Sequence, residues 1–80
     1  MKVQLKAFGI AKDILGDTSL EIDIQERMTV QEFKIHIAEA YPDFKVLANF
    51  NIAINEEYAM DSDQIVSGSE IVIIPPVSGG

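Results

Sequence analysis

The sequence predicts an α+β roll, in which a mixed β-sheet is covered on one face by one main helix. Three observations predict this class. Apolar and polar residues alternate along three short segments, as they do in half-buried strands. One central segment shows helical spacing instead, and one run near the end is apolar at every position. The chain has 80 residues, which suit one domain, and a single helix can cover only one face of the sheet.

The first two strands are predicted from alternation of apolar and polar side chains. Positions 3, 5 and 7 are apolar between lysine and glutamine, and residues 20–24 repeat the pattern. Phe8 falls on the polar side of the first alternation. Residues 9–17 connect the two strands and are too many for a tight hairpin. Within this connection, residues 10–15 can form a helical turn that Gly16 ends.

The main helix is predicted over residues 30–40. Thr29 and Glu32 fit a capping box, and Met28 and Phe33 occupy the two positions of a hydrophobic staple. Pro42 disfavours helical geometry at the residue before it, so the helix should end there. Four residues at helical spacing form the expected apolar stripe: Val30, Phe33, Ile37 and Ala40.

The second half of the chain should supply three further strands. Residues 50–54 alternate, residues 55–57 read as a turn, and residues 58–60 can form a short edge strand. Residues 61–69 are loop-like. Residues 71–74 are entirely apolar and should therefore lie centrally in the sheet, with Pro75 and Pro76 marking the end of its pairing.

The last strand predicts an apolar surface on the face that the helix leaves open. Ile71 and Ile73 point to one side of this strand, whereas Val72 and Ile74 point to the other, and the sequence does not say which pair faces the helix. Together with Phe8, an outward-facing Val72 and Ile74 would form an exposed apolar patch, which usually marks a protein interface. The alternatives are a loop that covers the patch, or scattered surface residues without a role.

Composition and charge exclude several classes of function. The chain has no cysteine, which excludes disulfides, cysteine-ligated metals and a cysteine nucleophile. Six basic and thirteen acidic residues give a net charge of −7, which disfavours nucleic acid and permits a basic protein partner, although acidity can simply keep a small protein soluble. No apolar run is long enough for a membrane span, and residues 1–6 lack the core of a signal peptide. We therefore expect a cytoplasmic protein without a membrane partner.

The sequence contains no complete catalytic or metal-binding motif. His36 is the only histidine, and its spacing from Glu32 suggests no further metal ligands, so we expect a solvated or ion-paired side chain. Asp61 and Asp63 resemble the start of a calcium loop, but the later ligand position is Ile65 and the glycine position is Val66. No nucleophile elbow or phosphate-binding loop is present. We predict no metal site and no active site of its own.

The final residues are the strongest functional candidates. We divide the chain into a domain over residues 1–74 and a flexible tail over residues 75–80. The two prolines hold the tail extended, so that it reaches at most about 20 Å from the domain. Gly79 and Gly80 lack a side chain and can enter a narrow channel, which would present the carboxylate of Gly80 to another protein's active site. The alternative is a frayed terminus.

Particular segments carry a resemblance to a known family. The ending "PPVSGG", preceded by "SGSEIVIIP", resembles the small subunits of molybdopterin synthases, which are ubiquitin-like sulfur carriers with a β-grasp fold. The segments "VQLKAFGIAKDILG" and "FNIAINEEY" resemble other parts of the same family, so that the likeness covers essentially the whole chain. Related thiamine-pathway carriers also end in Gly-Gly but lack the Pro-Pro-Val-Ser segment. The family often has Gly-Asp where this chain has Gly68-Ser69, a departure that affects a turn.

The resemblance implies a reaction cycle at Gly80 in molybdenum cofactor biosynthesis. An E1-like adenylating enzyme uses ATP to activate the carboxylate, a sulfur donor protein converts it to a thiocarboxylate, and the large synthase subunit accepts the tail. There the sulfur is transferred to the cyclic pyranopterin precursor. This chain would bind no cofactor and act as the non-catalytic, sulfur-donating subunit. The remaining tail residues would dock the chain: Gly79, Ser78, Val77, Pro76 and Pro75. Phe8, Val72 and Ile74 would contact both protein partners.

Two other functions remain open from the sequence. A ubiquitin-like protein modifier would use the same activated Gly80 to form an isopeptide bond with a lysine. A non-covalent adaptor domain would use the apolar patch and would tolerate an extra residue after Gly80.

Overall fold

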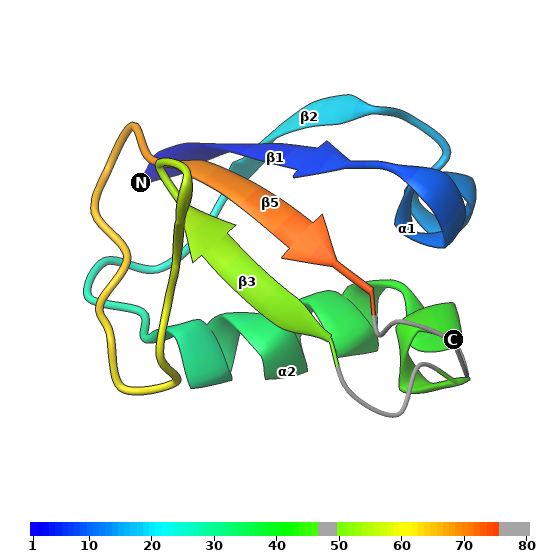
Figure 1. Ribbon diagram of the computed structural model, residues 1–80. Coiled ribbons are helices and arrows are strands. Elements are labelled where there is room, and N and C mark those ends of the chain that lie inside the picture. The colour runs from blue at the N-terminus through cyan, green and yellow to red at the C-terminus, as the bar shows by residue number, and fades with distance from the viewer. Residues whose placement is uncertain (47–49, 76–80) are drawn as a thin grey trace.

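The computed structural model describes residues 1–46 and 50–75 of the chain. It confirms the predicted α+β roll, with helices packed against a mixed sheet (Figure 1). The helices are α1 (Gly9–Leu15), α2 (Val30–Ala40) and the short 3-10 helix η1 (Pro42–Val46). The strands are β1 (Lys2–Ala7), β2 (Ser19–Asp23), β3 (Asn51–Ile54), β4 (Glu57–Tyr58) and β5 (Glu70–Ile74).

The sheet has five strands in the order β2-β1-β5-β3-β4. β5 runs parallel to β1, with Leu5 opposite Ile71, and antiparallel to β3, with Ile52 opposite Ile73. The central position of β5 confirms the prediction made from its continuous apolar run. Because β1 and β5 are parallel, their carboxyl ends lie at the same end of the sheet.

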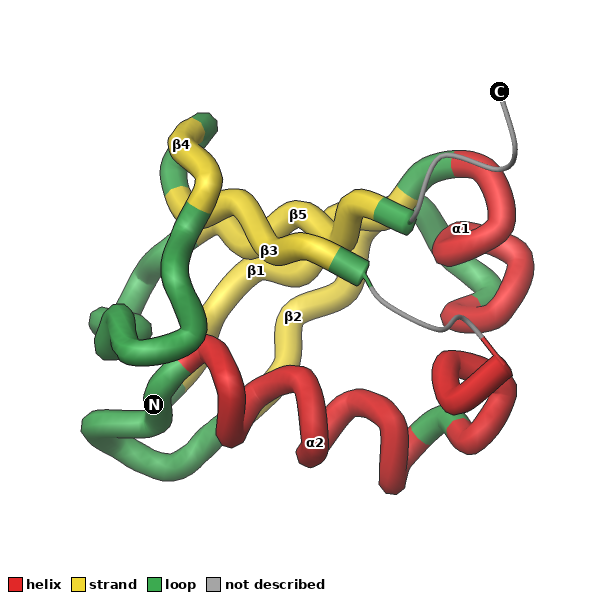
Figure 2. The backbone as a smooth tube through the Cα atoms, turned by 60° about the horizontal axis from the view of Figure 1, so that its bottom comes forward, coloured by secondary structure: helices red, strands yellow, loops and turns green. Residues whose placement is uncertain are grey.

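The core lies between the sheet and α2, which crosses one of the sheet's faces (Figure 2). From β5, Ile71 and Ile73 point into it and are 0% and 1% exposed. From α2, Phe33 and Ile37 are equally buried. Complete burial of one such side chain contributes about 1.5–3 kcal/mol to the stability of the fold. The contact between β5 and α2 therefore determines which face of the sheet is covered.

The bounds of α2 match the prediction because its end signals are strong. Thr29 and Glu32 form both halves of the capping box: the Glu32 amide donates to the Thr29 side chain at 3.2 Å, and the Thr29 amide donates to the Glu32 carboxylate at 2.9 Å. The inclusion of Ala40 in the buried stripe was wrong, because its side chain is exposed. The chain turns at Tyr41 into η1, and Phe44 of η1 fills the core at this end of the helix.

The connections follow the predicted turn signals, with two differences in detail. The helical turn predicted within residues 10–15 is a complete helix, α1, and Gly16 ends it with a φ of +83°, as expected. Asn55 and Glu56 take positive φ values in the turn after β3. The edge strand predicted at residues 58–60 instead covers Glu57–Tyr58, since the turn is completed one residue earlier.

Candidate functional site

The three residues predicted as a patch lie on the face of the sheet opposite α2. Val72 and Ile74 are half-buried and alternate with the buried Ile71 and Ile73 along β5. Phe8 follows directly after β1 with an extended backbone, so it continues the alternation of that strand, and it is 59% exposed. Lys6 is opposite Val72 in the parallel register, which places Phe8 beside Ile74.

Two further residues, which were not predicted from the sequence, extend this patch. Ala53 of β3 is opposite Val72, and Tyr58 of β4 is opposite Ala53. Tyr58 is 74% exposed, whereas the small Ala53 side chain is covered. The signal for Ala53 was its place between Ile52 and Ile54, which puts it on the outer face of a strand. We use the term open-face strip for these side chains: Phe8, Ala53, Tyr58, Val72 and Ile74.

Ion pairs border the open-face strip toward the other end of β1. The Lys6 ammonium lies 3.1 Å from the Glu70 carboxylate, and the Lys2 ammonium lies 3.6 Å from that of Glu21. The outer face is therefore apolar where β1 and β5 end and charged where they begin. A partner that bound the strip would meet a charged rim on this side.

β5 carries the chain to the point where the predicted tail starts. It pairs with β1 on one side and with β3 on the other, so Ile74 is anchored at the centre of the sheet. Pro75 is half-buried and is the last described residue. The other tail residues assigned a role lie outside the described residues: Pro76, Val77, Ser78, Gly79 and Gly80. Their attachment point is thus at the same end of the sheet as Phe8.

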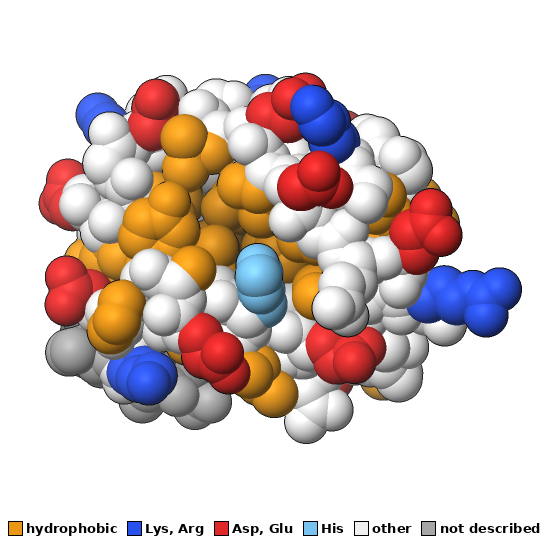
Figure 3. Space-filling view, turned by 180° about the vertical axis from the view of Figure 1, so that it is seen from behind, with side chains coloured by type: hydrophobic (Ala, Val, Ile, Leu, Met, Phe, Trp, Pro, Cys, Tyr) orange, Lys and Arg blue, Asp and Glu red, His pale blue; other side chains and the backbone are white. Residues whose placement is uncertain are grey.

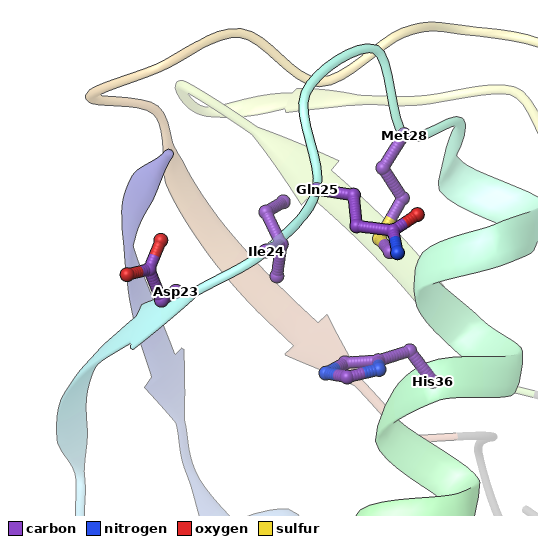
Figure 4. A pocket seen from close by; sticks show the side chains of 5 residues that line it. All are labelled: Asp23, Ile24, Gln25, Met28 and His36. Atoms are coloured by element: carbon purple, nitrogen blue, oxygen red, sulfur yellow. The ribbon is translucent and has the colours of Figure 1, made fainter.

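The polar residues considered as metal ligands either have structural roles or lie apart from one another. Asp61 accepts a hydrogen bond from the Lys34 ammonium at 2.8 Å, and Asp63 accepts one from the Met60 amide at 2.9 Å. His36 is exposed on α2 and points toward Ile24 at the edge of a hollow (Figure 4). Within residues 1–46 and 50–75, His, Asp and Glu form no group of three that could hold a metal ion.

The turn before β5 uses a buried serine at the position where the sequence departs from the family pattern. Ser69 is 1% exposed, and its hydroxyl donates to the Val66 carbonyl at 2.6 Å. Gly68 has a φ of +80° and donates its amide to the Lys2 carbonyl. Ser69, the residue that departs from the family pattern, therefore closes a turn at the end of the sheet that carries the charged rim. In the described part of the chain, no helix is both long and apolar enough to cross a membrane.

Comparison with known proteins identifies a family and several named relatives of this chain. The profile described as the ThiS family matches residues 5–80. A "molybdopterin synthase sulfur carrier subunit" of Caenorhabditis elegans is 32% identical, over 100% of this chain and 99% of that protein. A protein of the same name from Dictyostelium discoideum is 35% identical, over 91% of this chain and 90% of that protein.

Solved structures share the fold over nearly the full chain. A putative molybdopterin converting factor, subunit 1, from Pyrococcus furiosus has a TM-score of 0.86 and 26% identity, covering 96% of this chain and 99% of that one. The ubiquitin of Caldiarchaeum subterraneum has a TM-score of 0.66 and 18% identity, covering 100% and 98%. A chain in the complex of subunits 1 and 2 of the molybdopterin-converting factor from Helicobacter pylori matches with a TM-score of 0.67 and 23% identity, covering 100% of this chain and 100% of that one. These likenesses confirm the ubiquitin-like β-grasp fold.

Proposed function

Because the chain belongs to the ThiS family, we propose that it is the sulfur carrier subunit of a molybdopterin synthase. The observation that carries the proposal is the family match, which extends through Gly80, together with full-length relatives that bear this name. The fold is consistent with a carrier, since the central strand β5 leads directly into the segment "PPVSGG".

The chemistry of the proposal takes place at the carboxylate of Gly80. A carboxylate is a poor electrophile, so an activating enzyme first joins one of its oxygens to the α-phosphate of ATP and releases pyrophosphate. The sulfur of a donor protein then attacks the acyl carbon, and AMP leaves with its oxygen. When the donor is a persulfide, a thiol then cleaves the S–S bond, which forms a disulfide and leaves a thiocarboxylate at Gly80. The thiocarboxylate sulfur attacks the pterin precursor, and water hydrolyses the resulting acyl–sulfur bond, so that the sulfur stays on the pterin and Gly80 returns to a carboxylate. ATP belongs to the activating enzyme in this scheme, and this chain supplies the acyl group.

The open-face strip is the proposed contact for the large synthase subunit. The name of the Helicobacter pylori complex states that subunits 1 and 2 of that factor form a protein–protein complex, and this chain shares the fold of the matched chain in it. Phe8, Val72 and Ile74 lie beside the start of the tail, so a protein that holds the strip would receive the tail at the same time. We propose that the E1-like enzyme uses the same strip, which would make the two partners compete. The docking of Pro75 to Gly79 in a channel of each partner is part of this proposal.

Reconstitution with purified partners tests the function. The full chain, loaded with sulfur, is mixed with the large subunit and the cyclic precursor, and molybdopterin is measured. A variant that lacks Gly80 should keep the thermal unfolding curve of the full chain but form no product. A truncated chain that still supports molybdopterin formation would contradict the proposal. Lysine conjugates in place of product would favour the protein modifier instead.

A further inference from the structure

An apolar groove lies between β2 and α2, on the side of the molecule shown in Figure 3. Leu20 and Ile22 face the α2 side of the sheet, yet they remain half-buried because the helix does not fully cover β2. At the Ile22 end is a hollow of about 360 Å³, lined by Asp23, Ile24, Gln25, Met28 and His36 (Figure 4). At the Leu20 end is another of about 210 Å³, lined by Ile14, Ala40, Tyr41, Pro42 and Asp43. We call the two hollows and the apolar surface between them the β2–α2 groove.

The β2 side of this groove is an open strand edge. β2 is the first strand in the sheet order, so within the described part of the chain no strand pairs with its outer side. Met1 and Ile24 exchange both backbone hydrogen bonds, at 2.6 and 2.8 Å, which sets the alternation along the β1–β2 ladder. By that alternation, Leu20 and Ile22 bond to β1, whereas the N–H and C=O groups of Glu21 and Asp23 point outward. Such an edge can accept a further strand.

The rim of the groove is acidic. Asp23 lines the hollow on the strand side, where its carboxylate pairs with the Met1 ammonium at 3.1 Å, and Glu39 follows His36 by three residues on the helix side. Asp43 lines the hollow at the far end, and Glu32 lies one turn before His36. Among the residues that line the two hollows, His36 is the only one that can carry a positive charge. Figure 3 shows carboxylates on both sides of the apolar area around the histidine.

We propose that the β2–α2 groove binds an extended segment of a partner protein with alternating aliphatic residues flanked by lysine or arginine. The segment adds as a strand beside β2, its aliphatic side chains enter the groove, and its cations meet the acidic rim. A second copy of this chain fits poorly, because it would bring the same acidic rim and a net charge of −7. The chain's own residues 76–80 carry one aliphatic side chain, Val77, and no cation.

This site goes beyond the proposed sulfur carrier function. The open-face strip and the groove lie on different sides of the sheet, so two partners can bind at once. A protein held in the groove would leave Phe8, Val72 and the tail free. The groove therefore suits a partner that keeps the carrier near its enzymes without competing for the strip.

An NMR titration of the full chain tests the proposal without any sulfur chemistry. The probe is a synthetic peptide with alternating valine and threonine in its centre and lysines at both ends. We expect amide shifts to concentrate in residues 19–25 and around His36, and to leave Val72 and Ile74 unchanged. The same peptide with glutamates at its ends should bind about tenfold more weakly or worse, a loss of about 1.4 kcal/mol. Shifts confined to the open face, or equal affinity for both peptides, would overturn the proposal.

Matched variants separate strand addition from simple charge attraction. Glu21→Pro removes an outward N–H without breaking the bonds to β1. It should reduce affinity at least tenfold relative to Glu21→Gln, which loses the same charge but keeps the N–H, while the spectrum remains that of a folded chain. Glu39→Lys changes the rim, and Glu57→Lys makes the same change in β4 at the opposite edge of the sheet. Only Glu39→Lys should weaken binding of the lysine peptide. Equal effects of both lysine variants would mean that net charge alone attracts the peptide. Concentration-dependent shifts at β2 without peptide would assign the groove to a second copy. Either result overturns the proposal.

Discussion

Lys6 and Glu70 form an ion pair across β1 and β5, with 3.1 Å between ammonium and carboxylate. Lys6 lies opposite Val72 in the register, but its side chain extends back to Glu70, one pair away on the same face. The ammonium is therefore directed toward the charged end of the face and away from Ile74 and Phe8. Both side chains are about 40% exposed, so the pair adds less than about 1 kcal/mol to stability.

Glu70→Gln should slow association with the large synthase subunit. The substitution leaves the Lys6 ammonium unpaired beside the open-face strip, where it would repel the basic partner that we expect. We predict a several-fold lower association rate at low salt, an effect that fades at high salt, and an almost unchanged melting temperature. Stopped-flow binding at two salt concentrations measures this. Glu39→Gln on α2 removes the same charge far from the strip and serves as the control; an equal loss in both variants would show that position does not matter.

The two faces of β5 should respond differently to truncation. Ile71 is fully buried, and Ile71→Ala should lower the free energy of unfolding by about 2–5 kcal/mol. Val72→Ala, on the other face, should cost about 1 kcal/mol or less but should weaken binding of the large subunit. Urea unfolding and a binding titration on both variants give the comparison. Unchanged partner affinity in a folded Val72→Ala variant would remove this residue from the proposed interface.

Part of this architecture could be predicted from the sequence because its local signals agree with one another. The capping box at Thr29 and the proline at position 42 set the bounds of α2, and the continuous apolar run placed β5 at the centre. Which side of β5 faces the helix could not be predicted, because all four residues 71–74 are aliphatic and only the packing of α2 distinguishes them. Ala40 was wrongly placed in the buried stripe because the helical spacing continues to residue 40, whereas Phe44 of η1 fills the core at this end of α2.

The prediction of the site is limited in the same way, because contacts between segments distant in sequence leave no local pattern. Phe8, Val72 and Ile74 could be proposed from the alternation along each strand, since an aromatic on the polar side is conspicuous. Ala53 and Tyr58 join them only through the pairing of β3 with β4 and β5, which depends on strands distant in sequence. The β2–α2 groove likewise depends on how far the helix lies from the edge strand, which no local pattern encodes.

The start of α2 should make stability depend on pH in acid. Hydrogen bonds from the Thr29 amide and then from its side chain hold the pKa of Glu32 below the usual range of a glutamate. Because the folded pKa is the lower one, this stabilisation is complete above the unfolded pKa, about 4.3, and is lost as pH falls through the folded value. The difference in unfolding free energy between the wild type and Glu32→Gln should therefore shrink on acidification below that point. A difference that stays constant across this range would contradict the assignment.

Thr29→Ala provides the matching test of the cap at neutral pH. The variant loses the acceptor for the Glu32 amide, and we expect it to cost about 1 kcal/mol. Thermal unfolding at pH 7 measures this cost. A melting temperature equal to that of the wild type would show that the capping box adds nothing to the stability of the helix.

In the proposed function, the carboxylate of Gly80 carries the sulfur. Intact-mass spectrometry of the chain after incubation with the activating enzyme, ATP and a sulfur donor tests it most directly. We predict that one oxygen is replaced by one sulfur, that the replacement depends on ATP, and that it is absent in a variant with an added residue after Gly80. The same gain of sulfur in the extended variant, or no gain in the full chain under conditions where the activating enzyme consumes ATP, would contradict it.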